Sequence, residues 1–153
     1  MDDKDIRILG LLQQNARMPN RELARQLDMA PSGTLERIKK LEKNNIIRGY
    51  HARIDPKQVG RGLLAFLFVR TSDRVGDLST ARALAAIDEI LEVHHMAGDD
   101  CYLVKVRTHD TQTLADFMRA KLNPIDSITT TNTLIVFETI KETSDLTLHS
   151  ADE

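Results

Sequence analysis

The chain has 153 residues, which is enough for one domain or two small ones. A hydrophobic fraction of 41% allows a core, but with 4% aromatics and no Trp the packing must come from Leu, Ile, Val and Met. The net charge of −2 is unevenly divided: Lys and Arg outnumber Asp and Glu by 12 to 8 through residue 60, and from residue 61 the ratio is 9 to 15. This asymmetry favours binding of a polyanion by the N-terminal part and not by the remainder.

Three further features exclude other classes of protein. The single Cys101 cannot form an intramolecular disulfide, which fits a reducing compartment. The start, Met1–Asp5, lacks the basic and apolar regions of a secretory signal, and the longest apolar run, Leu63–Val69, is far too short to cross a bilayer. We therefore expect a cytoplasmic protein with no membrane partner, no cofactor, no metal site and no catalytic residues.

The first predicted element is a helix near Asp3 to Gln14. Asp3 and Asp5 suit the positive N-terminal end of a helix. An apolar face recurs at helical spacing and consists of Ile6, Leu9 and Leu12. This helix can bury the inner faces of the two helices that follow.

Residues 20–44 predict two short amphipathic helices joined by a tight corner at Asp28–Ala30. Asn20 can cap the first helix, and Pro31 suits the first turn of the second, where the helix needs no N–H from it. The apolar stripe of the first helix is Leu23, Ala24 and Leu27, and that expected for the second is Leu35, Ile38 and Leu41. The pattern is typical of a helix-turn-helix, whose second helix lies in the major groove of DNA.

The outer surface of the second helix is cationic. The residues expected there are Ser32, Gly33, Glu36, Lys39, Lys40 and Lys43, with Arg37 on the flank. A solvated surface would also carry such charges, so this helix alone does not decide between DNA binding and solubility.

The next stretch, Ile46–Ile54, favours DNA binding. It predicts a β-hairpin turning near Gly49, which makes a winged helix whose wing can reach the phosphate backbone. The predicted DNA contacts are Arg17, Arg21, Ser32, Gly33, Thr34, Glu36, Arg37, Lys40, Arg48 and Arg53. Residues 55–62 contain one Pro and two Gly and read as a linker after a DNA-binding domain of residues 1–54.

The second half alternates strands and helices in the order βαββαβ. The expected elements are strands at 63–70, 90–97, 101–108 and 130–140, helices at 77–88 and 111–122, and a turn at 98–100. The order predicts an α+β, ferredoxin-like domain over residues 63–142, with both helices on one face of an antiparallel sheet and a polar tail at 143–153.

The uncovered face of that sheet predicts a homodimer. The strands Leu63–Val69 and Leu134–Phe137 are apolar on both sides, so the face without helices needs a partner. A second copy, packed sheet against sheet, is the economical solution, although the N-terminal domain folding back is the alternative. Two recognition helices on a two-fold axis would then read half-sites about 34 Å apart on duplex DNA.

The whole chain resembles the Lrp/AsnC family, the feast/famine regulators of bacteria and archaea. The resemblance is carried by Asp2–Leu9, Arg21–Ala24, Thr34–Glu42, Ile46–Tyr50, Asp55–Pro56, Gly98–Asp100 and Tyr102–Lys105. It implies an N-terminal winged helix, a ferredoxin-like domain that dimerises, assembly up to octamers, and an amino acid or related small molecule bound between subunits.

The resemblance also implies where the effector binds. The expected pocket lies at the turn and is completed by the last strand of a neighbouring subunit, with the residues Ala97, Gly98, Asp99, Asp100, Cys101, Leu134, Ile135 and Val136. Backbone N–H groups of a Gly-containing turn can hold a carboxylate, and an aspartate can pair with an ammonium group. Taken without the resemblance, Gly98–Asp100 is equally an ordinary hairpin turn.

One residue departs from the family pattern. Many members have an aspartate where this chain has Cys101, and a thiol that is mostly neutral at pH 7 is a poor partner for an ammonium group. Either Asp100 takes that role, the ligand differs, or the site is silent.

Two other functions remain open. Sirohaem decarboxylases share the two-domain plan, and His94 or His95 would then face the tetrapyrrole; the cationic second helix of residues 20–44 argues against this enzyme. Because the two histidines are adjacent on a strand, their side chains point to opposite faces and cannot chelate one ion. An effector-independent architectural DNA-binding protein is the other alternative. The expectation that remains is a non-enzymatic, effector-responsive transcription regulator.

Overall fold

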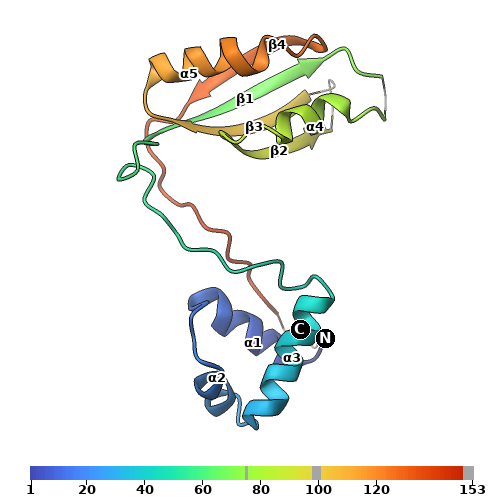
Figure 1. Cartoon of the computed structure of the whole chain (residues 1–153), viewed down its shortest axis with the longest axis vertical. Helices are drawn as coiled ribbons and strands as arrows, with labels where there is room; N and C mark the ends of the chain where they lie inside the picture. Colours follow the sequence, from blue (N-terminus) through green and yellow to red (C-terminus); the bar gives the residue numbers. More distant parts are fainter. Residues whose placement is uncertain (75, 98–100, 150–153) are drawn as a thin grey trace. The chain divides into compact units, whose positions relative to one another are not determined.

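The structure, a computed structural model, describes residues 1–74, 76–97 and 101–149 (Figure 1). It divides into two compact units, one formed by Met1–Arg53 together with the segment from Glu142 onward, the other by Ile54–Lys141. The sequence places the tail from residue 143 in neither domain, whereas in the structure it belongs to the first unit. The chain therefore passes between the units twice.

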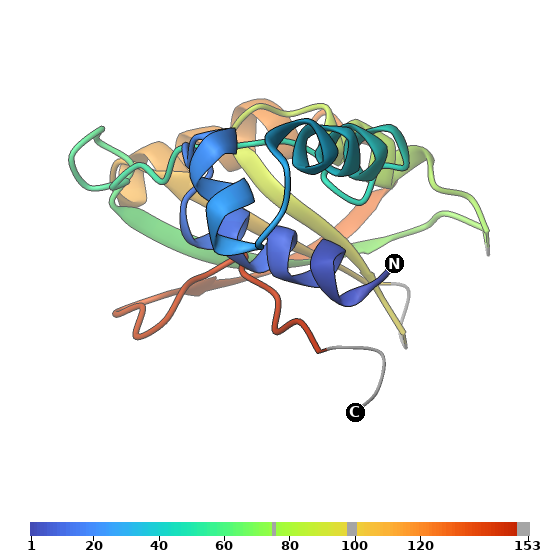
Figure 2. The same ribbon diagram turned by 90° about the horizontal axis from the view of Figure 1, so that it is seen from below.

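The first unit contains three helices, α1 (Asp3–Gln14), α2 (Asn20–Gln26) and α3 (Pro31–Lys43), which cross one another (Figure 2, blue to cyan). Asp2 caps α1, because its carboxylate accepts from the Asp5 N–H while the Asp5 carboxylate accepts from the Asp2 N–H. The buried apolar residues of this unit are Ile8, Leu23, Ala24, Leu27 and Leu41. Each helix contributes to them, so the three helices share one small core.

The second unit has the predicted βαββαβ order. Its elements are β1 (Leu63–Thr71), α4 (Ser79–Ala85), β2 (Ile90–Met96), β3 (Cys101–Thr108), α5 (Thr111–Phe117), the short π-helix η1 (Met118–Leu122) and β4 (Ile128–Ile135). The strands lie in the order β2-β3-β1-β4, and every neighbouring pair is antiparallel. This confirms the predicted fold class, although α4 is shorter than 77–88 and β4 ends five residues before the predicted residue 140.

One face of this sheet packs against the helices and makes the core. Alternate residues of β1 (Ala65, Leu67 and Val69) and of β3 (Tyr102, Val104 and Val106) are buried together with Leu84, Leu114, Phe117 and Leu122 from α4, α5 and η1. The alternation follows from the two-residue period of a strand. The intervening residues must therefore lie on the opposite face.

That opposite face, which we call the open face, is apolar near its centre. Phe66 and Phe68 of β1 are half-buried, and Leu134 of β4, directly across from Phe66, is 50% exposed. Beside them Lys105 of β3 donates to the Glu92 carboxylate of β2 at 3.0 Å. Leu64, at the end of this face, is buried, so the exposed apolar surface is centred on Phe66, Phe68 and Leu134.

No helix in the described ranges is both long and apolar enough to span a membrane.

Candidate nucleic-acid interface and effector site

The inward face of α3 differs from the predicted one. Thr34, expected to face DNA, is fully buried, and its hydroxyl donates to the Ala30 carbonyl at 3.2 Å. Leu35, expected in the core, is 42% exposed. The inward residues are Thr34, Ile38 and Leu41, so Thr34 is removed from the set of DNA contacts and Leu35 lies on the surface.

The geometry of an α-helix explains the difference. Successive residues are about 100° apart, so a step of three residues drifts by about 60° and two such steps by about 120°. The predicted stripe of Leu35, Ile38 and Leu41 has that drift. Steps of four and then three, from Thr34 to Ile38 to Leu41, stay within about 60° and suit a narrow core.

The exposed face of α3 remains polar and cationic. Its exposed residues are Ser32, Leu35, Glu36, Lys39, Lys40 and Lys43, and Gly33 is half-buried against Met29, with Met29 Cε 3.8 Å from where a Cβ would lie. In the part of the chain that the structure describes, none of Lys39, Lys40 and Lys43 forms an ion pair. These lysines are therefore available to an external anion.

Arg37, predicted to face bases or nearby phosphates, forms ion pairs within the first unit. Its guanidinium lies 2.7 Å from the Asp2 carboxylate and 2.8 Å from the Asp5 carboxylate, and the side chain is 32% exposed. The pKa of Asp2 is lowered by the Asp5 backbone N–H and then by Arg37, and the two aspartates raise the pKa of Arg37. We call this cluster the Arg37 clasp; it ties α3 to the start of α1.

Asn20 also has a tertiary role in place of the predicted cap. It is the first residue of α2, makes no side-chain cap hydrogen bond, and donates through Nδ2 to the Pro31 carbonyl at 2.8 Å. This bond holds the start of α2 against the start of α3. The neighbouring Arg21 is exposed, as a phosphate contact requires.

The predicted hairpin at Ile46–Ile54 does not form, because no described residue there belongs to a strand. Instead the segment lies alongside the C-terminal tail: Arg53 donates through Nη2 to the Glu142 carbonyl at 3.0 Å. Tyr50 donates to the Glu42 carboxylate at 2.9 Å, and burial together with this bond raises the pKa of Tyr50 to about 12. Of the predicted wing cations, Arg48 is exposed and Arg53 is partly committed to the tail.

The tail is held by α1 as well. Gln13 donates through Nε2 to the Leu146 carbonyl at 3.0 Å and accepts from the Leu146 N–H at 2.8 Å. Tail residues Ser144–Leu146 and Leu148 line a hollow of about 470 Å³ with residues of α1 and with Ile46–His51. The segment from 142 to 148 is thus an integral part of the DNA-binding unit.

The predicted effector residues do not converge within one subunit. Gly98, Asp99 and Asp100 lie outside the described residues. In the sheet, Arg70 pairs with Cys101 on one side and with Thr130 on the other. Phe66 pairs with Lys105 and with Leu134, four residues away along β1. Ala97, Leu134 and Ile135 are exposed, and Val136 donates its N–H to the Leu64 carbonyl at 2.9 Å. Among the described residues, Cys101 and Leu134 therefore lie at different levels of the sheet.

Two hollows flank β4 at the end where Thr130 and Cys101 lie. One, of about 400 Å³, is lined by Phe68, Arg70, Thr130, Thr131 and Asn132; the other, of about 390 Å³, lies between η1 and Ile128–Thr131 and includes Arg119. These hydroxyl and guanidinium groups are not among the effector residues predicted from the sequence. The run Thr129–Asn132 was the available signal, since consecutive polar residues on a strand beside an apolar sheet are unusual.

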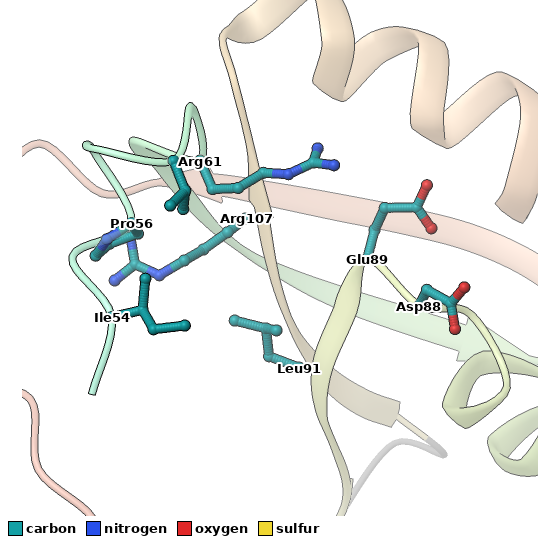
Figure 3. A pocket seen from close by; sticks show the side chains of 8 residues that line it. Ile54, Pro56, Arg61, Asp88, Glu89, Leu91 and Arg107 are labelled. Atoms are coloured by element: carbon teal, nitrogen blue, oxygen red, sulfur yellow. The ribbon is translucent and has the colours of Figure 1, made fainter. Parts of the chain in front are cut away.

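A third hollow, of about 440 Å³, lies at the other end of the sheet (Figure 3). It is lined by Ile54, Pro56, Val59, Arg61, Asp88, Glu89, Leu91 and Arg107. Figure 3 shows the two guanidinium groups directed apart and the two carboxylates on the β2 side. Arg107 pairs with Leu64 at one end of β1, whereas Cys101 pairs with Arg70 at the other end. This hollow is therefore separate from the predicted effector site.

The two histidines considered for tetrapyrrole binding are both engaged by neighbours. His94 Nε2 lies 3.2 Å from the Glu92 carboxylate, and the His95 ring stacks at 5.0 Å on Tyr102, a core residue on the helix side of the sheet. The predicted divergence of the two side chains is therefore confirmed. In the described residues no three His, Cys, Asp or Glu side chains are grouped to hold a metal ion.

Two family descriptions match the sequence. "Winged helix-turn-helix DNA-binding" covers residues 1–48, and "Lrp/AsnC ligand binding domain" covers residues 64–146. The HTH-type transcriptional regulator FL11 of Pyrococcus horikoshii is 35% identical over 147 residues, 95% of each protein. The leucine-responsive regulatory protein of Haemophilus influenzae is 34% identical over 151 residues, 97% of this chain and 90% of that protein.

Solved structures agree with these matches. The transcriptional regulator NMB0573 of Neisseria meningitidis in complex with L-Met has a TM-score of 0.87 and 30% identity, with 96% of each chain covered. AsnC of Escherichia coli has a TM-score of 0.86 and 28% identity, covering 95% of this chain and 97% of that one. With a DNA-binding helix-turn-helix in its first unit and a ligand-binding βαββαβ domain in its second, the chain belongs to the Lrp/AsnC family of transcriptional regulators.

Proposed function

We propose that this regulator is a homodimer that binds specific sites on duplex DNA and changes its binding in response to an amino acid, without enzymatic activity. The observation that carries the proposal is the exposed face of α3, where Lys39, Lys40 and Lys43 have no ion-pair partner among the described residues. A protein that neutralises phosphates with such lysines gains affinity by releasing counterions. Ser32, Gly33, Glu36 and Lys40 are then placed for base edges and nearby phosphates, and Arg17, Arg21 and Arg48 for the backbone.

The test uses the full-length protein and duplexes selected from a random library. Lys40→Glu should abolish enrichment or weaken binding strongly, because it removes one phosphate contact and adds a like charge. Lys40→Gln should lower the slope of log K against log salt by about 0.9 if Lys40 neutralises one phosphate. Lys121→Gln is the matched control, since Lys121 is an exposed lysine in the second unit. Wild-type protein that enriches no sequence at low salt would refute the proposal.

The open face supports the proposed dimerisation. The half-buried Phe66 and Phe68 and the half-exposed Leu134 form an apolar surface on a sheet whose other face is already covered. A symmetric sheet-against-sheet dimer would remove it from water and double the number of DNA contacts. Higher assembly, up to an octamer as in the family, would supply the second subunit that the effector site needs.

The proposed effector is a free amino acid, the class represented by L-Met in the Neisseria meningitidis structure. In this chain the site would combine the turn Ala97–Cys101 with Leu134–Val136 of a neighbouring subunit. Thr130, at the level of Cys101, would add a hydroxyl for the carboxylate. Because Cys101 cannot pair with an ammonium group as a carboxylate does, we expect weak binding in the wild type and tighter binding in Cys101→Asp.

Calorimetric titration with the twenty amino acids tests this part. At least one should bind and change DNA affinity by about 5- to 150-fold, the usual range of allosteric coupling. Absence of binding to both the wild type and Cys101→Asp, with an unchanged oligomer distribution, would favour an effector-independent DNA-binding protein. Titration with sirohaem should give no haem-type absorption band; such a band would indicate the enzymatic alternative.

A further inference from the structure

The exposed face of α3 carries one apolar side chain among polar ones. Leu35 is 42% exposed, and its surface neighbours at helical spacing are Ser32 and Lys39. No other large apolar residue of α3 is exposed: Ile38 is half-buried and Leu41 is buried. The exposed apolar surface is therefore one side chain wide, too small for a protein partner.

The position of Leu35 along the helix is informative. It is the fifth residue of α3, in the N-terminal half of the helix, where a recognition helix contacts base edges, whereas Lys39, Lys40 and Lys43 occupy the second half. It lies about 60° around the helix from Ile38 and about 40° from Lys39, at the border between the core and the exposed face. Its side chain cannot turn inward, because Thr34, Ile38 and Leu41 occupy the core side.

The major groove presents one apolar group on its base edges, the C5 methyl of thymine. We propose that Leu35 contacts a thymine methyl and so selects an A·T pair in each half-site. The proposal rests on the DNA binding proposed above and adds a specificity-determining residue to it. A polar side chain at this position would gain nothing from the methyl, and a leucine would lose contact with a cytosine or with any base lacking that group.

The experiment removes the methyl without changing the pairing. The preferred site of the full-length protein is first obtained by selection from random duplexes. The thymines of this symmetric site are then replaced by uracil one at a time, and the affinity of the protein for each duplex is measured by fluorescence anisotropy. One position per half-site should lose about fourfold in affinity on replacement, as expected for one buried methyl group. Replacement in both half-sites should then cost about 15-fold.

Variants assign the effect to the side chain. Leu35→Ala should bind the thymine and uracil duplexes equally, so that the variant and the base replacement are not additive. Ile46→Ala is the matched control, because Ile46 is 44% exposed in the same unit but lies beyond α3, and it should retain the full fourfold effect.

The outcomes separate this inference from the function on which it rests. Failure to enrich any sequence would refute sequence-specific binding itself. Enrichment with no thymine sensitive to uracil, or an equal uracil effect in wild type and Leu35→Ala, would refute the contact with Leu35 and leave DNA binding intact. Circular dichroism of Leu35→Ala should match the wild type, since alanine is the best helix former.

Discussion

Leu134 provides the sharpest test of the dimer. It lies on the open face opposite Phe66 and is 50% exposed in the isolated chain, so about half of its side chain remains to be buried by a partner. Full burial of a leucine contributes about 1.5–3 kcal/mol, so half of it amounts to about 0.75–1.5 kcal/mol per subunit. Two-fold symmetry doubles this to about 1.5–3 kcal/mol per dimer.

Leu134→Ala should therefore raise the dimer dissociation constant by roughly 10- to 150-fold. The adjacent Ile135 is a matched control: it is 43% exposed but, being level with Ala65, it lies on the helix side of the sheet. Ile135→Ala should leave dimerisation almost unchanged at protein concentrations below those that form larger assemblies. Sedimentation velocity over a dilution series measures both constants.

The comparison of the two variants decides the geometry. Equal weakening by both would show that the strand edge, and not the open face, forms the contact. Weakening by Ile135→Ala alone would place the interface on the helix side. Neither result is compatible with sheet-against-sheet packing.

Three further predictions concern the first unit. Arg37→Ala should lower its melting temperature at neutral pH. The pKa of Asp2 is lowered in the folded state, so this carboxylate contributes fully to stability above its ordinary pKa of 3.8, and the contribution is lost as the pH falls from 3.8 through the lowered value. The difference from wild type should therefore shrink below pH 3.8, and a difference independent of pH would contradict the Arg37 clasp. Gln13→Ala removes both hydrogen bonds to Leu146 and should cost about 1 kcal/mol, seen as faster amide exchange of Leu146; unchanged exchange would show that the tail is held by other contacts. Ile8→Ala should cost about 2–5 kcal/mol and separate the unfolding of this unit from that of the second unit in calorimetry; a single shared transition would contradict independent cores.

The sequence was sufficient for the order of elements and for the family. The apolar run of β1, the helical spacing in α1 and the acidic residues Asp3 and Asp5 at the start of α1 are local signals, and the structure confirms the two elements that they predicted. Such local signals predict an element correctly when its segment buries a single face or lies wholly in the core.

The side chains of α3 were harder to predict. A leucine is normally assigned to the core in preference to a threonine, but Thr34 satisfies its hydroxyl on the Ala30 carbonyl and can be buried at little cost. Leu35 then lies outside the buried stripe formed by Thr34, Ile38 and Leu41. Likewise, Arg37 and Asn20 were predicted from local rules, whereas their partners, Asp2 with Asp5 and Pro31, lie 11 to 35 residues away.

The missing hairpin has a similar cause. A β-turn signal near Gly49 predicts that Ile46–Ile54 pairs with itself, but the segment finds its partner in the tail, about 90 residues later, through Arg53 and Glu142. Periodicity within the segment carries no information about that partner. The start of β4 at Ile128 was missed because Thr129–Asn132 are polar, as an exposed edge strand allows.

The return of the chain to its first unit has a mechanical consequence. Two covalent tethers, at residues 53–54 and 141–142, join the units, so cleavage of the chain at either tether alone would leave the two units connected. The second tether begins six residues after β4, the strand proposed to touch the effector. The covalent path from the end of this strand at Ile135 to Leu146, which Gln13 holds through two hydrogen bonds, is therefore only about ten residues long.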